Sequence, residues 1–256
     1  MHPLLDSDEI SVERVDGKWR YTRSMVEPTC VYTQESEQTD EQVLADGPPS
    51  LPSGQLERIA RELGMEPLDM PWFRDRLLRE RIAGDDLEGV RALLDAPAAE
   101  LLTLAIEGRA WRVAAELVER GATLVAPPRS KVSPIDFLVA RLDDGGVRLL
   151  DLIDLAPLDG LLRLARTPGV ARKLIALGAS VEACGPAGHT MIGPELGVAT
   201  PLMVAVVLER FAVAEALLEA GASLETRDAH GRTPREFATW WGRESSIAWL
   251  RERTSG

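Results

Sequence analysis

The sequence predicts a mainly α-helical protein whose helix pairs stack into a solenoid, with a small β-hairpin appendage at the N-terminus. Two Thr-Pro pairs, Thr200-Pro201 and Thr233-Pro234, stand 33 residues apart, and each opens an apolar run with helical spacing. Three apolar runs end in Gly-Ala, at Gly121, Gly178 and Gly221. A helix pair of this size cannot bury its apolar faces alone, so it must stack against similar pairs.

The first expected element is a hairpin over residues 9–22. The segment EISVERVDGKWRYT alternates apolar and polar residues around Asp16-Gly17, and Asp-Gly is a preferred centre of a tight hairpin turn. A third extended piece is expected near residues 29–33. Residues 1–34 are therefore predicted to form the β-hairpin appendage.

A flexible acidic linker is expected next, over residues 35–54. Residues 35–46 hold five acids and no base, and they run into the segment GPPSLPSG. The first 55 residues carry 11 acids and four bases, against 30 and 25 in the rest of the chain. Because a linker would isolate the appendage, we expect removal of residues 1–50 to leave the thermal transition of the helices nearly unchanged.

The helical repeat domain is expected over residues 55–256. A first helix starts near Ser53 and ends at Gly64, and residues 72–94 contain two antiparallel helices joined at residues 84–86. Aspartates in that joint can cap the second helix.

Further helix pairs follow along the chain. The expected helices cover residues 98–107 and 110–120, a helix opened by Ser133-Pro134 and one over 147–153, and residues 158–165 and 170–177. No Gly-Ala stands near residue 154, so this repeat is expected to have a shortened or rebuilt finger. Residues 184–199 are rich in glycine and proline and are expected to form a long loop. Gly221 is expected to adopt a left-handed conformation that ends its helix.

The C-terminal pattern resembles the ankyrin-repeat family. Thr233, Pro234, Ala238 and Gly242 match the family pattern Thr-Pro-x-x-x-Ala-x-x-x-Gly. The resemblance covers roughly residues 72–253, about six helix pairs, and is clearest over 200–253. It implies an ankyrin-like solenoid that binds partner proteins through its concave face and finger loops. It also implies that the variable pair before the glycine, Trp240 and Trp241, faces the groove.

The aromatic residues divide into two groups. Trp111 and Trp249 are assigned to the helix core, with Phe137 and Phe237 as companions. Trp240 and Trp241 are adjacent on one helix and point about 100° apart, so both indoles cannot be buried against one neighbouring repeat. If one of the two caps the last core layer, we expect it to be Trp240.

Catalytic and metal motifs are weak. Cys184, His189 and Met191 stand close together in sequence, but metal sites usually gather about four ligands and the remaining histidines are His2 and His230. No glycine-rich phosphate loop and no nucleophile motif is recognisable. We therefore expect no catalytic residue, no metal and no cofactor.

Composition narrows the class of partner. The net charge is −12 with a pI near 4.8, which argues against a nucleic-acid partner. No apolar run approaches the length of a membrane span, and the acidic N-terminus lacks a secretory signal, so we expect a cytoplasmic protein. Cys30 and Cys184 fit reduced thiols. Lysine is nearly replaced by arginine, which suggests a bacterial source.

The expected function is binding of another protein, with no membrane contact. The expected binding residues lie in the last finger and helix and in the long loop, namely Ala229, His230, Arg232, Trp240, Trp241, His189 and Glu195. Two alternatives remain at this point. One is an enzyme with its site between the N-terminal module and the solenoid, and the other is an acidic immunity-type or inhibitor protein that neutralises a basic toxin.

Overall fold

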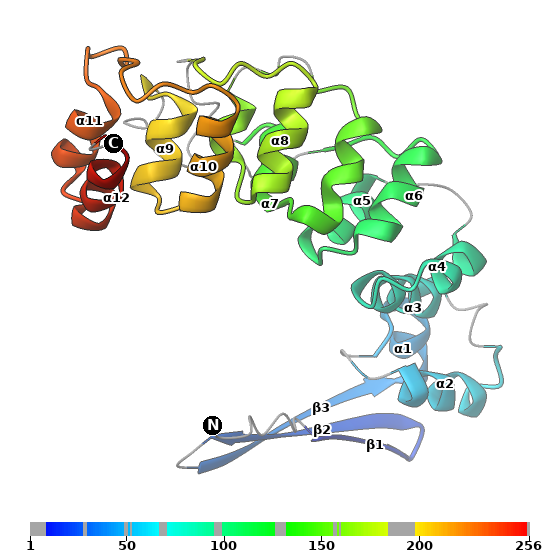
Figure 1. The fold of residues 1–256 in the computed structure, drawn as a ribbon. Coiled ribbons are helices and arrows are strands. Elements are labelled where there is room, and N and C mark those ends of the chain that lie inside the picture. The colour runs from blue at the N-terminus through cyan, green and yellow to red at the C-terminus, as the bar shows by residue number, and fades with distance from the viewer. Residues whose placement is uncertain are drawn as a thin grey trace. The chain divides into compact units, whose positions relative to one another are not determined.

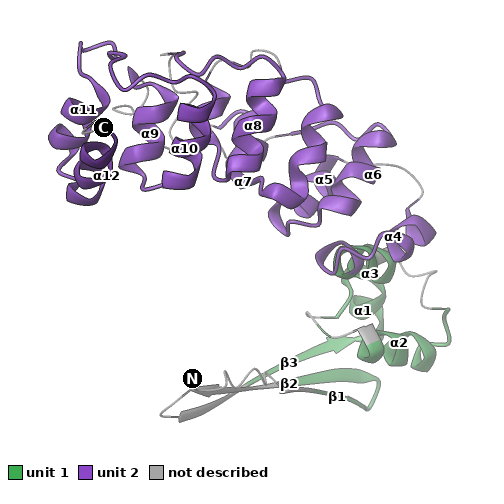
Figure 2. Ribbon diagram, viewed as in Figure 1, with its two compact units in different colours: residues 1–80 green, residues 81–256 purple. Residues whose placement is uncertain are grey.

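The computed structural model describes residues 9–27, 30–48, 51, 53–66, 71–94, 99–125, 132–155, 158, 160–183 and 198–254. The protein is mainly α-helical with a small antiparallel sheet near the N-terminus, as expected (Figure 1). It divides into two compact units, residues 1–80 and 81–256 (Figure 2). The expected boundary near residue 54 is therefore too early, because α2 (Ser53–Glu62) and most of α3 (Pro71–Ala83) belong to the first unit.

The sheet has three antiparallel strands in the order β1 (Glu9–Val15), β2 (Lys18–Glu27) and β3 (Cys30–Thr39). The predicted hairpin is confirmed, since Val15 pairs with Lys18 across Asp16 and Gly17. Both turn residues have positive φ, 51° and 73°, as a tight turn of this kind requires. The expected third extended piece is also present, but it continues to Thr39.

The expected linker is wrong for residues 35–46. Residues 35–39 complete β3, and α1 (Asp40–Asp46) follows without a break. Thr39 and Gln42 form a reciprocal capping box, in which the Gln42 amide donates to Thr39 Oγ1 at 3.2 Å and the Thr39 amide donates to Gln42 Oε1 at 2.9 Å. Asp40 and Glu41 lie in the first turn, where the helix dipole favours negative charge. The acidic composition thus marks a helix start.

The first unit has a hydrophobic core shared by its sheet and helices. Trp19 is fully buried, and its Nε1 donates to Asp40 Oδ1 at 2.7 Å. The core residues are Val12, Trp19 and Tyr21 from the sheet, Val43 from α1, Leu51, Leu56, Ile59 and Ala60, and Phe73 from α3. The hairpin is therefore not isolated by a linker, because it shares a core with the helices of the first unit. The effect of removing residues 1–50 on the thermal transition of the helices stays a prediction.

The second unit consists of two rows of helices (Figure 1). One row, the first-helix row, contains α5 (Ala99–Glu107), α7 (Pro134–Arg141), the 3₁₀ helix η3 (Leu161–Leu164), α9 (Pro201–Val207) and α11 (Pro234–Trp241). The other, the second-helix row, contains α4 (Leu87–Leu93), α6 (Trp111–Glu119), the 3₁₀ helix η2 (Asp144–Asp151), α8 (Pro168–Ala176), α10 (Phe211–Glu219) and α12 (Glu244–Thr254).

Four helices of the described second unit begin with the same N-cap pattern. A Ser or Thr N-cap accepts a hydrogen bond from the amide three residues on, and proline follows in the first turn, at Ser133, Thr167, Thr200 and Thr233. The start at Thr167-Pro168 was not predicted, and it begins the second-row helix α8.

Three helices end at a glycine with positive φ. Gly121, Gly178 and Gly221 have φ of 94°, 102° and 95°, which confirms the left-handed conformation expected at Gly221. In the last case the Gly221 amide donates to Leu218 O and the Ala222 amide donates to Leu217 O. This is the double closure of a Schellman motif.

Several expectations for the middle of the stack are corrected. The helix expected over 147–153 is the 3₁₀ helix η2, which already begins at Asp144 because the Asp143 carboxylate caps it by accepting from the Gly145 amide at 3.0 Å. Gly145 and Gly146 leave room for the Trp111 ring. A Cβ on Gly146 would stand 2.8 Å from the Trp111 ring. The helix expected over 158–165 is shortened to η3.

The core assignment of the aromatic residues holds only in part. Phe137 and Phe237 are buried, as expected. Trp111 and Trp249 are only half-buried. Trp249 stacks on Phe211 at 5.4 Å between ring centroids and carries the Arg253 guanidinium on its ring at 3.9 Å.

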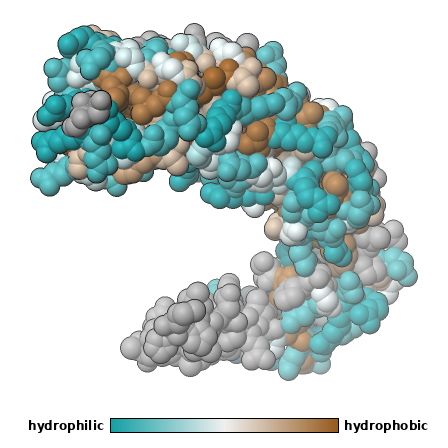
Figure 3. Space-filling model, in the orientation of Figure 1, coloured by the Kyte–Doolittle hydropathy of each residue, from teal (hydrophilic) through white to brown (hydrophobic). Residues whose placement is uncertain are grey.

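The visible face of the second unit shows hydrophobic residues gathered between more hydrophilic margins (Figure 3). None of the helices in the described part of the chain combines the length and the apolar character that crossing a bilayer demands.

Candidate functional site

The last finger, residues 228–232, is built around the carboxylate of Asp228. Asp228 is 5% exposed, and its Oδ1 accepts from the amides of His230 at 2.9 Å and Arg232 at 2.8 Å. Its Oδ2 accepts from Arg232 Nε at 2.8 Å, and the Asp228 amide donates to Arg232 O at 2.9 Å. Gly231 takes a φ of 77° to close the turn. The exposed residues Ala229 and His230 are thus presented by a fixed turn.

The charge of Asp228 is maintained in this position. Burial by itself would raise the pKa of Asp228, but the hydrogen bonds from the backbone and side chain of Arg232 and from the His230 amide lower the pKa below its usual value. The finger therefore contains an ionised, hydrogen-bonded carboxylate at neutral pH.

Arg232 connects the finger to α11. Its guanidinium lies over the Trp240 ring at 4.3 Å from the centroid and over the Phe237 ring at 4.8 Å. Phe237 is fully buried, so one face of this arrangement rests on the core. A guanidinium held over an indole in this way gains a cation–π attraction.

The two indoles have different environments. Trp240 is 52% exposed, while Trp241 is half-buried and stacks on Phe237 at 5.9 Å between centroids. The rings contact each other edge to face at 5.5 Å. Both cannot be hidden, as expected, but the expectation that Trp240 caps the core is wrong. Both rings lie 5.9 Å from the Phe237 ring between centroids, and they differ in orientation: Trp241 is stacked on Phe237 at 29°, whereas Trp240 is tilted at 42°.

An open hollow adjoins Trp240. Its volume is about 710 Å³, and its lining residues are Leu224, Glu225, Arg227, Thr233, Arg235, Glu236, Thr239 and Trp240. Arg227 and Glu236 form an ion pair across it at 3.3 Å. Sequence reasoning missed the hollow, because residues 224–227 precede the finger and meet α11 only after the chain has turned back.

Five of the seven predicted binding residues come together here: Ala229, His230, Arg232, Trp240 and Trp241. We call these five residues, together with the hollow, the C-terminal surface. His189 and Glu195 lie outside the described residues, as does most of the loop expected over 185–199. The end of that loop does reach the finger, since the Ala229 amide donates to Val198 O at 3.2 Å.

Most of the first-helix row is closed to a partner. Every residue of α9 is buried, and so is every residue of η3, including Arg163 at 2% exposure. In α7, residues 136–140 are buried. In contrast, α11 exposes Arg235, Glu236, Thr239 and Trp240. Along the described part of this row, α11 offers the largest open helix face.

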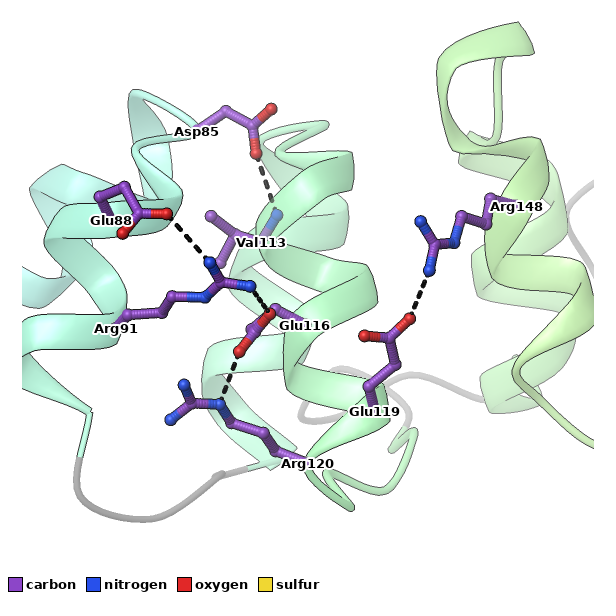
Figure 4. A network of polar contacts seen from close by, with 8 residues as sticks. All are labelled: Asp85, Glu88, Arg91, Val113, Glu116, Glu119, Arg120 and Arg148. Carbon is purple, nitrogen blue, oxygen red and sulfur yellow. Dashed lines mark hydrogen bonds and ion pairs between the residues drawn. The ribbon is translucent and has the colours of Figure 1, made fainter.

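The second-helix row carries an ion-pair ladder in which neighbouring helices are joined by opposite charges. Arg91 of α4 forms an ion pair with Glu116 of α6 at 2.6 Å, and Arg148 of η2 forms an ion pair with Glu119 of α6 at 2.6 Å (Figure 4). The remaining rungs are Asp151–Lys173, Arg172–Glu219 and Glu215–Arg253. Hydrogen bonds from Arg91 and Arg120 lower the pKa of Glu116 to about 2. The charged side chains of this face therefore largely form ion pairs with one another within the stack.

Nothing in the described ranges groups three or more His, Cys, Asp or Glu residues as a metal ion would require. Cys184, His189 and Met191 lie outside those ranges.

Comparisons with known proteins do not assign the chain to a family. No family model matches the chain, and no curated protein matches it. One similar solved structure is described as the Bd0816 predatory endopeptidase from Bdellovibrio bacteriovorus in complex with immunity protein Bd3460. It has 17% sequence identity and a TM-score of 0.48, and the match covers 69% of this chain and 97% of that chain.

Proposed function

We propose that this protein is an ankyrin-type binding module that captures another protein through its C-terminal surface and carries no catalysis of its own. The observation that supports the proposal most is Trp240, which is 52% exposed although it belongs to a rigid cluster of aromatic and guanidinium groups. Exposed tryptophan and arginine held in a fixed geometry are the side chains that most often dominate binding energy between proteins.

The position of the binding surface is supported by the burial and the ion pairing of residues elsewhere on the second unit. The side chains of α9 and η3 are buried, and the charges of the second-helix row are largely occupied by the ion-pair ladder. The C-terminal surface differs in offering an exposed indole with an adjoining hollow and a finger whose residues Ala229 and His230 are exposed. A partner that covers it would bury apolar area at the centre and meet charged groups at the rim, as stable interfaces do.

The ankyrin-type assignment is supported by recurring local geometry. Helices α7, α9 and α11 begin with the same Ser/Thr-Pro cap, and helices α6, α8 and α10 end at a left-handed glycine. Such repetition is what a solenoid built from one duplicated unit requires.

The test is capture of partners by the full-length tagged chain from a lysate of the source organism, compared with Trp240→Ala. We expect the variant to lose a partner that the wild type captures, at a loss of about 2 kcal/mol or more in binding. Because Trp240 is largely exposed, its circular dichroism and Tm should stay close to wild type. Trp249→Ala is the matched control, as it removes a half-buried tryptophan from the opposite row. Equal capture by wild type and Trp240→Ala would refute the assignment.

A narrower second candidate is an acidic inhibitor that neutralises a basic protein. It is supported by the net charge of −12, to which residues 1–80 contribute 17 acids and nine bases. The complex would then form with one cationic partner at fixed stoichiometry and weaken steeply as salt is added. A complex whose affinity is the same at low and high salt would exclude this candidate while leaving the broader proposal in place.

A further inference from the structure

The sheet of the first unit has β1 as an edge strand in the described part of the chain (Figure 1). β3 forms the other edge, but α1 lies against it, and the capping box at the start of α1 uses the Thr39 amide of that strand. The closest backbone packing of β1 is with β2 alone. An open edge strand offers unpaired backbone groups, to which an extended segment of another chain can add. We call residues 11–15 of this strand the β1 edge.

The register of the hairpin decides which backbone groups of β1 point outward. Val15 and Lys18 flank a two-residue turn and form a hydrogen-bonded pair, and such pairs alternate along an antiparallel ladder. The amide and carbonyl of Glu13 therefore face β2, while those of Val12 and Arg14 face away from it. The outward groups bond no other element among the described residues. They are two residues apart, which is the spacing that a further antiparallel strand requires.

The exposed face of the sheet carries a row of alternating charges. Glu13 lies directly across from Arg20, and Arg20 lies across from Glu37. The Arg20 guanidinium bonds Glu37 at 2.8 Å, whereas Glu13 forms no ion pair with any described residue. The row therefore ends at the β1 edge with an unpaired acid. Because opposite charges stabilise cross-strand neighbours, a strand added there would continue the row with lysine or arginine beside Glu13.

Val15 adds an apolar contact to the β1 edge. It is 43% exposed and lies on the same face of the sheet as Glu13, two residues along the strand. An apolar residue of the added strand, two positions from the basic one, would cover this side chain. The β1 edge thus favours a segment that combines a basic and an apolar residue at a spacing of two.

Charge distinguishes a basic partner from a second copy of this chain. Residues 9–46 contain nine acids and four bases. Two of these bases, Arg14 and Arg20, are already in ion pairs. Pairing of two β1 edges would bring two acidic sheets together, whereas a basic segment would be attracted.

We propose that the β1 edge binds an extended basic segment of a partner protein as a fourth strand of the sheet. The backbone of that segment bonds the outward groups of Val12 and Arg14. A lysine or arginine lies beside Glu13, and an apolar residue two positions away lies on Val15. This surface is separate from the C-terminal surface and does not depend on the function proposed for it.

The experiment selects peptides from a phage-displayed library of random dodecapeptides on the full-length protein and measures their affinity by fluorescence anisotropy. Enriched peptides should carry lysine or arginine two positions from a bulky apolar residue. Glu13→Gln should weaken their binding by about threefold, the effect of one cross-strand charge pair. Hydrogen exchange followed by NMR should show that the bound peptide protects the amides of Val12 and Arg14. The Glu13 amide faces β2 and should change little.

Glu35→Gln is the matched control, because Glu35 is an exposed acid on the same face of the sheet but on β3. Its binding should equal that of the wild type. The proposal is overturned if no peptide is enriched, if the enriched peptides lack basic residues, or if Glu13→Gln and Glu35→Gln behave alike. Unchanged exchange at Val12 and Arg14 would show that no strand is added and would also overturn it. Loss of binding with Trp240→Ala would assign the peptides to the C-terminal surface, with the same consequence.

Discussion

Asp228 illustrates how one buried side chain fixes the geometry of a surface that other residues use. Its carboxylate holds two amides of the finger and the Arg232 guanidinium, which in turn lies on Trp240. Arg232 therefore has a structural role in addition to any contact with a partner. A substitution of Arg232 would leave a buried carboxylate without its cation, so loss of binding in such a variant would not by itself locate the interface.

The first prediction concerns Asp228→Asn. At neutral pH it should lower the free energy of unfolding by about 2 kcal/mol, because an ionised and hydrogen-bonded acceptor is lost. The folded-state pKa of Asp228 lies below its unfolded value, so its contribution is present above about pH 4 and is lost as pH falls through the folded pKa. Urea denaturation should show the gap between wild type and variant at pH 7 and its closure in acid. Glu225→Gln, which changes an exposed acid nearby, is the control, and a gap that persists in acid would contradict the assignment.

At the scale of elements, the Schellman turns decide where helices stop. Gly221 has a φ of 95°, and a Cβ built there would meet nothing within 4 Å. A substitution at Gly221 is therefore destabilising because of its backbone conformation, and not because the new side chain collides with other atoms. Asp85, Arg109 and Glu209 adopt φ of 50–57° in the tight turns within helix pairs without being glycine, which shows that the turns can be imposed by the packing of both helices.

The second prediction is that Gly221→Val destabilises by about 1 kcal/mol or more, because a β-branched residue is penalised at positive φ. Gly221→Asn should cost less, since asparagine tolerates the left-handed region. Chemical denaturation of both variants tests the backbone argument, and equal midpoints for valine and asparagine would count against it.

At the scale of the whole molecule, the ion-pair ladder links successive helices of the second row. The five rungs lie at the surface and are partly exposed, so solvent screens each pair and each is expected to contribute little to the free energy of unfolding. The rungs place opposite charges against each other on successive helices of the second row, from α4 to α12.

The third prediction tests one rung. Arg148→Glu should lower the urea midpoint by placing a second acid against Glu119, and the added change Glu119→Arg should restore it. The coupling energy from the double-mutant cycle should fall within the range usual for exposed pairs and shrink at high salt. If the double variant were no more stable than Arg148→Glu alone, the rung would have no energetic role.

The fourth prediction concerns the first unit. Removing residues 1–50 takes away Val12, Trp19, Tyr21 and Val43, which pack with Leu56, Ile59 and Phe73. Hydrogen exchange should then show loss of protection in α2, while α9 and α10 remain protected. Undiminished protection of α2 in the truncated chain would mean that it folds without the sheet.

The sequence by itself determined the elements whose signals are local. Hydroxyl caps followed by proline, glycines at helix ends and the Asp-Gly turn each act on a few consecutive residues, so they specify helix and hairpin boundaries wherever the chain goes. The mainly helical class and the positions of Thr200, Thr233 and Gly221 follow from them. Only the tertiary structure decided that residues 35–46 are ordered as strand and helix. Residues 35–39 pair with β2, and Val43 of α1 is buried in the core that the sheet shares with α2 and α3. The capping box of Thr39 and Gln42 at the helix start is itself a local signal.

The tertiary structure also decided which tryptophan is exposed. Trp240 and Trp241 are the same residue type at adjacent positions, and they differ only in how Phe237 and Arg232 pack beside them. The close approach of Trp111 to Gly145 and Gly146 likewise joins two different helices, α6 and η2. In each case the deciding contact joins residues that are distant in sequence or on different faces, and no periodicity within a single segment encodes it.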